Sequence, residues 1–377
     1  MNSTPTRPVT SRTRAPVKRQ NAQNYLLLTV MSFAASVVLT RLFLMLTGFP
    51  KIGAGAFHVA HVLWGGLLLF VAALLPLVFA NRWVYTVSAL LNGLGVGLFI
   101  DEVGKFITQN NDYFYPLAAP IIYGFFLITV LIYFQVRRPP SQNARAELYR
   151  ALDMFQEMLD HDLDEQERAD LETQLQHVIQ HADQPDQARL ASVLTDFLAA
   201  DTLYLAPDVP TLWERLVQRG RAFEARWIGP RRLKVIIISG LGLFSFVAVA
   251  EPAVILFGLF SPGALEDIAR HLIEQGQVTG LYSLQWFFVG QALQGVVGIV
   301  LLAAALLMFT GRDRRGSQLG YFGLLASLTS VNLLTLYYNQ FGNLLLIVIE
   351  FGLLLALLHY RRRYLRQRTP AGEESDS

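Results

Sequence analysis

The chain contains no cysteine, and charged residues make up only 16% of its 377 residues. The lack of cysteine excludes a disulfide framework, thiolate-bound zinc or iron–sulfur clusters, and a cysteine nucleophile. Charge is scarce compared with the roughly 25% of soluble domains, whereas hydrophobic residues reach 53%. These apolar residues fall in blocks of about twenty, the length that spans the hydrocarbon core of a bilayer. The composition excludes a cytosolic or secreted enzyme and a mainly disordered chain, and it predicts a membrane protein with several spans.

Eight apolar segments are long enough to cross a membrane. Each is expected to be helical, because lipid offers no hydrogen-bond partner to an unpaired backbone group. The predicted spans are Tyr25–Thr47, Phe57–Phe79, Val84–Ile107, Leu117–Phe134, Leu233–Leu259, Leu284–Phe309, Leu319–Tyr337 and Phe341–Tyr360. The predicted fold class is therefore all-α: a polytopic helical membrane protein with eight transmembrane helices and a cytoplasmic helical insert.

The distribution of lysine and arginine predicts the orientation of the spans, because these residues are retained on the cytoplasmic side. Basic residues flank the ends of the spans that would face the cytoplasm: Arg7, Arg12, Arg14, Lys18, Arg19, Arg82, Arg137, Arg138, Arg231, Arg232, Lys234, Arg312, Arg314, Arg315, Arg361, Arg362, Arg363, Arg366 and Arg368. The alternate loops carry only Lys51 and Arg270. We predict a multi-pass protein of the inner (cytoplasmic) cell membrane, with both termini in the cytoplasm. The first apolar segment is too long for a cleaved signal peptide, so it is expected to stay in the membrane.

The segment between the fourth and fifth spans differs from the rest of the chain. Residues 141–228 hold 17 acidic residues against 8 arginines, a net charge of −9. Apolar residues at helical spacing predict four amphipathic helices, marked by Leu148, Leu152, Phe155 and Leu159, by Leu171, Leu175, Val178 and Ala182, by Leu190, Leu194, Phe197 and Leu198, and by Leu212, Leu216, Phe223 and Trp227. Such a bundle can close a small core and is expected to bind a protein partner, whereas its acidity argues against nucleic acid.

Together these patterns divide the chain into five predicted parts. They are a disordered basic tail (1–24), transmembrane helices one to four (25–136), a cytoplasmic acidic helical domain (137–231), transmembrane helices five to eight (232–360) and a tail that is first basic and then acidic (361–377).

Ionisable residues inside a span cost free energy and are therefore candidates for function. In the first half they gather at one depth, near the predicted outer ends of three spans: Arg41, His58, His61, Asp101, Glu102 and Lys105. Two basic and two acidic groups cancel, as a buried cluster requires if it is to stay ionised. Small residues recur along the face of the third span that bears Asp101, which predicts that a neighbouring helix packs there.

Two histidines three residues apart, together with a carboxylate, also suggest a divalent-metal site formed by His58, His61 and Asp101. The alternatives are a polar network without metal and a purely structural ion pair between Arg41 and Asp101. No cofactor is required by the sequence, and zinc is the metal that such ligands would suit.

Two carboxylates stand inside the spans of the second half. Glu251 lies near the predicted outer end of the fifth span, and Glu350 lies near the centre of the eighth, where a charge is most costly. Uncharged polar residues such as Gln291, Gln294 and Asn332 accompany them.

Three stretches of the chain resemble an uncharacterised family of bacterial polytopic membrane proteins. They are Thr47–Gly66 with its H-x-x-H-x-x-W-G-G pattern, Phe99–Thr108 with the sequence F-I-D-E-V-G-K-F-I-T, and Asn339–Phe341. The resemblance covers mainly the membrane-spanning half. It brings no established activity and so implies no mechanism.

Three classes of function remain open from the sequence. We favour a transporter, channel or small-ligand receptor with an outward-facing polar site, since this explains the cluster and both lone carboxylates. The second class is a membrane scaffold or sensor whose insert binds a partner. The third is a membrane-embedded metal-dependent hydrolase, which leaves Glu350 unexplained, so whether the protein is an enzyme stays open with enzymes ranked last.

Overall fold

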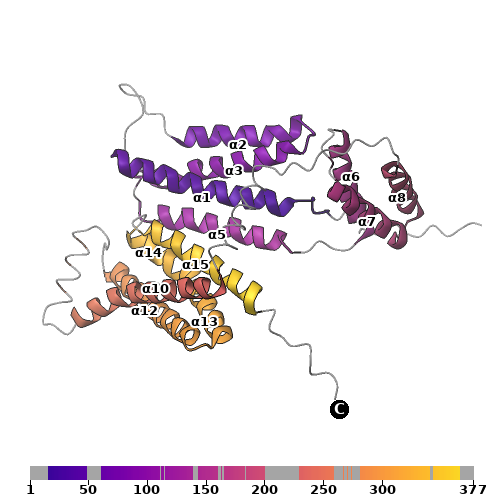
Figure 1. Cartoon of the computed structure of the whole chain (residues 1–377). Helices are drawn as coiled ribbons and strands as arrows, with labels where there is room; N and C mark the ends of the chain where they lie inside the picture. The colour runs from indigo at the N-terminus through magenta and orange to yellow at the C-terminus, as the bar shows by residue number, and fades with distance from the viewer. Residues whose placement is uncertain are drawn as a thin grey trace, which may run out of the picture. The chain divides into compact units, whose positions relative to one another are not determined.

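A computed structural model describes residues 16–48, 61–110, 112–113, 115–138, 143–159, 163, 165–182, 184–199, 229–258, 266, 270, 273, 281–339 and 343–365. All regular structure in these ranges is helical (Figure 1). The helices are α1 (Ala22–Thr47), α2 (His61–Val78), α3 (Trp83–Asp101), α4 (Val103–Ile107), α5 (Ala118–Val136), α6 (Ala144–Leu159), α7 (Glu165–His181), α8 (Pro185–Leu198), α10 (Pro230–Gly258), α12 (Leu281–Phe309), α13 (Asp313–Ala326), η2 (Ser327–Val331), α14 (Asn332–Asn339), α15 (Leu344–Tyr360) and η3 (Arg361–Leu365). The all-α fold class is confirmed.

Eight of these helical stretches are long and apolar enough to cross a membrane, as the sequence predicts. The first six stretches each lie within one helix. The seventh joins α13, η2 and α14, and the eighth joins α15 and η3. The stretches are Ala22–Thr47, His61–Val78, Trp83–Asp101, Ala118–Val136, Pro230–Phe257, Ser283–Phe309, Asp313–Asn339 and Leu344–Leu365.

The third span is shorter than the predicted Val84–Ile107. Helix α3 ends at Asp101, and Glu102 has backbone angles of φ −92° and ψ 10°, which lie outside the helical region. The chain then resumes as the short helix α4, which carries Lys105. The apolar residues on either side of the charged pair Asp101 and Glu102 led the sequence analysis to continue the span across this break.

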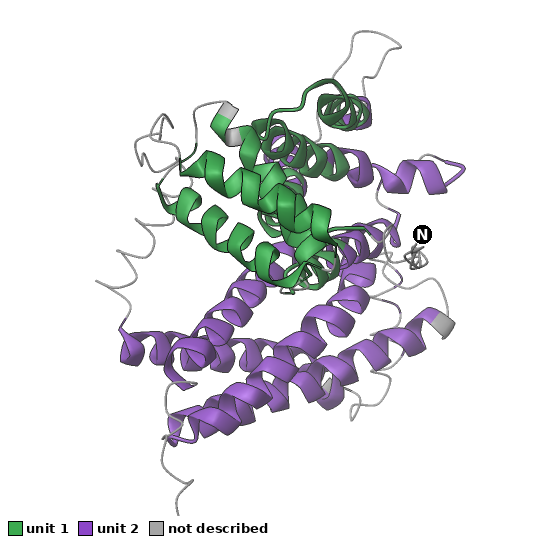
Figure 2. Cartoon of the chain, turned by 90° about the vertical axis from the view of Figure 1, so that its right-hand side faces the viewer, with its two compact units in different colours: residues 1–36, 64–97, 129–211 green, residues 37–63, 98–128, 212–377 purple. Residues whose placement is uncertain are grey.

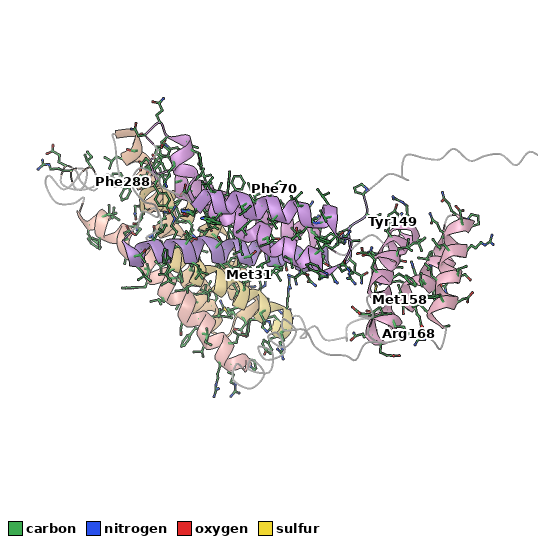
Figure 3. All side chains as sticks on the ribbon, turned by 90° about the horizontal axis from the view of Figure 1, so that it is seen from above. Met31, Phe70, Tyr149, Met158, Arg168 and Phe288 are labelled. Carbon is green, nitrogen blue, oxygen red and sulfur yellow. The ribbon has the colours of Figure 1, made fainter. Side chains whose placement is uncertain are left out.

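Large apolar side chains cover much of the outward surface of the spans. Met31 on α1 and Phe70 on α2, both labelled in Figure 3, are more than half exposed. Water would make such a surface unfavourable, whereas lipid tails accept it. This pattern supports contact with a lipid bilayer.

The described chain falls into two compact units, coloured in Figure 2. Unit 1 contains residues 1–36, 64–97 and 129–211, and unit 2 contains residues 37–63, 98–128 and 212–377. In unit 1, α3 packs closely on α1. A Cβ atom on Gly97 would lie 2.6 Å from Cβ of Ser36, and one on Gly93 would overlap Oγ of Ser32. Only glycine permits this approach, and the small-residue face of α3 is therefore a packing face.

The insert helices of unit 1 bury a small core of their own. Leu171, Leu175 and Val178 of α7 pack with residues of α6 and α8, among them Leu148 and Leu198. Within α8, Leu198 is buried, whereas Leu190 and Phe197 are exposed, so the buried face is rotated relative to the predicted apolar stripe. The predicted fourth helix lies outside the described residues.

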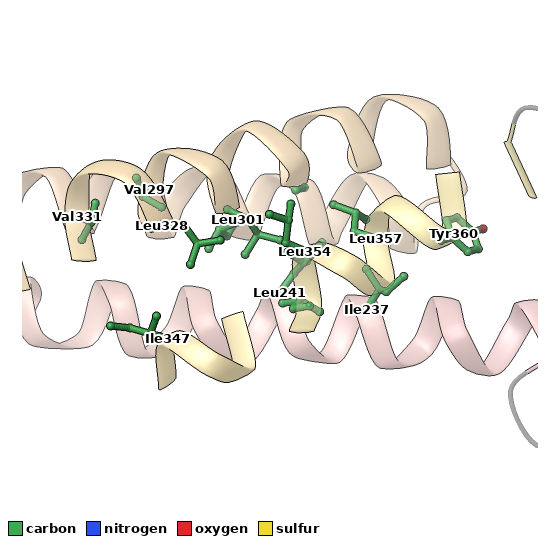
Figure 4. Packing of buried hydrophobic residues seen from close by; sticks show 14 of the residues in the cluster. Ile237, Leu241, Val297, Leu301, Leu328, Val331, Ile347, Leu354, Leu357 and Tyr360 are labelled. Carbon is green, nitrogen blue, oxygen red and sulfur yellow. The ribbon is translucent and has the colours of Figure 1, made fainter. Parts of the chain in front are cut away.

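In unit 2, helices α10, α12, α13 and α15 pack around a continuous apolar core. Figure 4 shows Ile237 and Leu241 of α10 beside Leu301 of α12 and Leu354 and Leu357 of α15. This core holds in place the helices that carry Glu251 and Glu350.

Candidate functional site

The centre of the candidate site is a buried ion pair between α1 and α3. Nε of Arg41 donates to Oδ1 of Asp101 at 2.5 Å, and Nη2 of Arg41 donates to the backbone oxygen of Asp101 at 3.1 Å. The two residues are 2% and 0% exposed. Loss of either partner would remove the opposite charge that lies beside a buried one.

His61, the first residue of α2, contacts two carboxylates. Its Nε2 lies 3.1 Å from Oδ2 of Asp101, and its Nδ1 lies 3.0 Å from Oε1 of Glu102. The same Glu102 oxygen accepts a hydrogen bond from Nζ of Lys105 at 3.2 Å. The structure thus brings Arg41, His61, Asp101, Glu102 and Lys105 into one network within unit 2. We call these five residues, together with Tyr113, the ionic cluster.

Tyr113 belongs to this cluster, although the sequence analysis did not single it out. Its hydroxyl donates to Oδ2 of Asp101 at 2.7 Å, and its ring lies 4.3 Å from the guanidinium carbon of Arg41. Burial and the neighbouring Asp101 charge raise the pKa of Tyr113 above its usual value, so its hydroxyl stays a donor. Tyr113 lies in the connection between α4 and α5, where the sequence carries no periodic signal to place it.

The ionic cluster is not buried uniformly. The side chains of His61 and Lys105 are 24% and 26% exposed, whereas those of Asp101 and Glu102 are almost fully enclosed. His61 and Lys105 are therefore the partly exposed groups that contact the two enclosed carboxylates, and of these two His61 contacts both.

His58, the second proposed histidine ligand, lies outside the described residues. Among the residues that the structure describes, no group of three or more His, Cys, Asp or Glu side chains has a geometry that could hold a metal. Within the described part, His61 and Asp101 contact one another. Asp101 also contacts Arg41 and Tyr113, and His61 also contacts Glu102.

The second half holds two further polar sites, both in unit 2. Glu251 of α10 accepts hydrogen bonds from Gln291 at 3.2 Å and Gln294 at 3.3 Å, both on α12. The carboxylate lies in the wall of a cavity that also involves residues of α14.

Glu350 of α15 forms the second of these two polar sites, and it lies in the protein interior. Its Oε2 accepts a hydrogen bond from Asn332 at 2.8 Å, and Ser327 is a further hydrogen-bonding neighbour of the carboxylate. Asn332 follows the π-helical turn η2, and the hydroxyl of Tyr123 donates to the backbone oxygen of Leu328 in that turn at 2.6 Å. Such π-helical turns occur frequently at functional sites.

The fold and these sites define a polytopic helical membrane protein with eight candidate spans and charged groups buried among them. No model of a known protein family matches the chain, and no curated protein or solved structure shows significant similarity to it. The helical membrane class is thus established, and no family is identified.

Proposed function

We propose that the protein is a membrane transporter or small-ligand receptor, that the ionic cluster is its outward-facing polar site, and that this site exchanges a proton. The observation that carries the proposal is the position of His61, whose two ring nitrogens each contact a different carboxylate.

A neutral imidazole has one N–H donor and one lone pair. With a carboxylate at each nitrogen, one contact would place a lone pair against a carboxylate oxygen. A proton shared among His61, Asp101 and Glu102 removes this repulsion, because the imidazole then donates at both nitrogens or one carboxyl donates to it. These two contacts support the proposal that the ionic cluster holds one exchangeable proton.

Charges of both signs surround His61. Arg41 contacts Asp101, and Lys105 contacts Glu102. Tyr113 adds one neutral donor to Asp101. A balanced set of this kind suits a site that gains and loses a proton as a ligand or a conformational change alters one contact. A purely architectural cluster would not need a histidine at its exposed edge.

Charge movement in reconstituted membranes tests this proposal. Proteoliposomes on a solid-supported membrane should give a transient current after a pH jump, because a proton enters a site within the membrane field. His61→Gln and Glu102→Gln should each reduce that current by about tenfold or more. His177→Gln is the matched control, since it removes an imidazole that pairs with Glu147 in the insert, and it should leave the current unchanged. Equal currents in wild type and His61→Gln would contradict the proposal.

A second candidate function is a scaffold or sensor that acts through the insert. It is favoured by exposed apolar residues on the described insert helices: Tyr149 and Leu152 on α6, and Val193 and Phe197 on α8. Phe155 and Phe197 contact one another at a ring separation of 6.4 Å and extend this apolar surface across both helices. In that case the double change Val193→Ser with Phe197→Ser should abolish partner binding while leaving the pH-jump current intact.

A further inference from the structure

The cavity beside Glu251 lies among three helices of unit 2 and is distinct from the ionic cluster. It has a volume of about 70 Å³, roughly half of the cavity of about 150 Å³ that holds benzene in an engineered protein. It is lined by Glu251, Phe287, Gly290, Gln291, Gln294, Leu334, Thr335, Tyr338, Asn339 and Asn343. The space suits a single small ion or a headgroup of a few atoms.

The charge of this lining has one sign. Among the described residues that line the cavity, Glu251 is the only carboxylate, and none is lysine, arginine or histidine. Asn339, the last residue of α14, also lines the cavity. A helix C-terminus carries a partial negative charge, which adds to that of the carboxylate. An anion would meet repulsion from both.

The hydrogen-bonding groups of the lining point to the same ligand chemistry. Gln291 and Gln294 use their amide N–H groups on Glu251. Among the described residues, the buried Oε1 of Gln291 has no hydrogen-bond partner. It belongs to the amide whose N–H holds Glu251, so its partial negative charge adds to that of the carboxylate. A cation or a cationic donor in the cavity would be attracted by both.

An aromatic wall completes the lining. Phe287 and Tyr338 pack edge to face with ring centroids 5.3 Å apart, and the Tyr338 hydroxyl donates to the backbone oxygen of Ser283 at 2.8 Å. That hydrogen bond fixes the tyrosine ring at the cavity. Aromatic rings favour a neighbouring cation through their quadrupole.

We propose that this cavity binds a small monovalent cation, with Glu251 as its principal ligand and Gln291 as the residue that positions this carboxylate. An alkali ion and the ammonium group of a small amine share this chemistry. The inference does not depend on the function proposed for the ionic cluster.

Thermal melting of the purified full-length protein in detergent tests the site. Sodium, potassium or methylammonium chloride replaces N-methyl-D-glucamine chloride at constant ionic strength and pH. A ligand that binds only the folded state raises the melting temperature in a saturable way. We expect this rise in wild type, and an apparent affinity at least about tenfold weaker in Glu251→Gln, since a charged hydrogen-bonding partner is lost.

Two further variants keep the test decisive. Gln291→Met retains the side-chain length but removes the amide that donates to Glu251, and it should also weaken binding even if Glu251→Gln does not fold. Glu165→Gln removes an exposed carboxylate at the start of α7 that does not line the cavity, and it should bind as wild type does.

Comparison of the three cations shows whether the ligand is an alkali ion or the ammonium group of an amine. A response to sodium or potassium identifies an alkali-ion site, whereas a response to methylammonium alone identifies an amine site. The absence of any response beyond that to N-methyl-D-glucamine, or equal responses in wild type and Glu251→Gln, overturns the proposal.

Discussion

Arg41 and Asp101 are joined twice, once through the Asp101 carboxylate and once through its backbone oxygen. The second contact lies at the last residue of α3, where the helix leaves backbone oxygens without an intrahelical partner. Arg41 therefore neutralises a charge and caps a helix end at the same place. This double role explains why an arginine, with several donors in a fixed plane, stands at this position.

The first prediction concerns this pair. Asp101→Asn removes the carboxylate charge that the buried Arg41 contacts, and it should destabilise the protein by about 3–5 kcal/mol. The double variant Arg41→Gln with Asp101→Asn should recover part of that loss, because no lone charge remains. Thermal unfolding in detergent of wild type, both single variants and the double variant gives the coupling energy. Strictly additive effects would show that the two side chains do not interact.

The second prediction concerns metal binding at the proposed ligands His58, His61 and Asp101. If the ligands bind zinc, added zinc should raise the melting temperature of wild type, and the effect should disappear in His58→Ala and His61→Ala. If the ionic cluster works without metal, zinc should leave all three proteins unchanged. A zinc effect of equal size in His61→Ala would place any bound metal elsewhere.

The sequence predicted the spans well because lipid imposes one dominant rule, namely a long apolar helix. It also predicted that Arg41 and Asp101 stand at a similar depth, which follows from counting residues along two spans. It did not predict that α3 stops at Asp101, because charged residues within a span can continue a helix as well as end one. Tyr113 was missed for a related reason, since only the tertiary path of its loop brings the hydroxyl to Asp101. The cavity at Glu251 combines residues about 90 positions apart, from Glu251 to Asn343, which periodicity cannot relate.

The third prediction concerns orientation, which rests on the distribution of basic residues alone. The chain has no cysteine, so a single introduced thiol reports its own position. Asn110→Cys should react with an impermeant maleimide in intact cells, whereas Glu165→Cys should react only after the membrane is permeabilised. Labelling of Glu165→Cys in intact cells would reverse the predicted topology.

The fourth prediction concerns the insert. Residues 141–228 expressed alone should fold, because α6, α7 and α8 share a buried core. Circular dichroism should show a helical spectrum with a cooperative thermal transition. Leu175→Ala, which opens a cavity at a fully buried position, should lower stability by about 2–5 kcal/mol, whereas exposed Val193→Ala should change it little. A random-coil spectrum would mean that the insert depends on the rest of the protein for its structure.

The last prediction concerns Glu350, which is buried and forms no salt bridge within the part of the chain that the structure describes. An isolated carboxylate would be very costly there, so we expect the side chain to be a neutral acid. Glu350→Gln should then leave stability within about 1 kcal/mol of wild type, because the glutamine oxygen can still accept the Asn332 hydrogen bond. Asn332→Leu should cost about 1–3 kcal/mol, since it leaves Oε2 of Glu350 without its donor. Infrared spectra at neutral pH give an independent measurement, in which a protonated carboxyl band present in wild type should be absent from Glu350→Gln. A loss of stability in Glu350→Gln as large as that in Asn332→Leu, without such a band in wild type, would show instead that Glu350 is ionised.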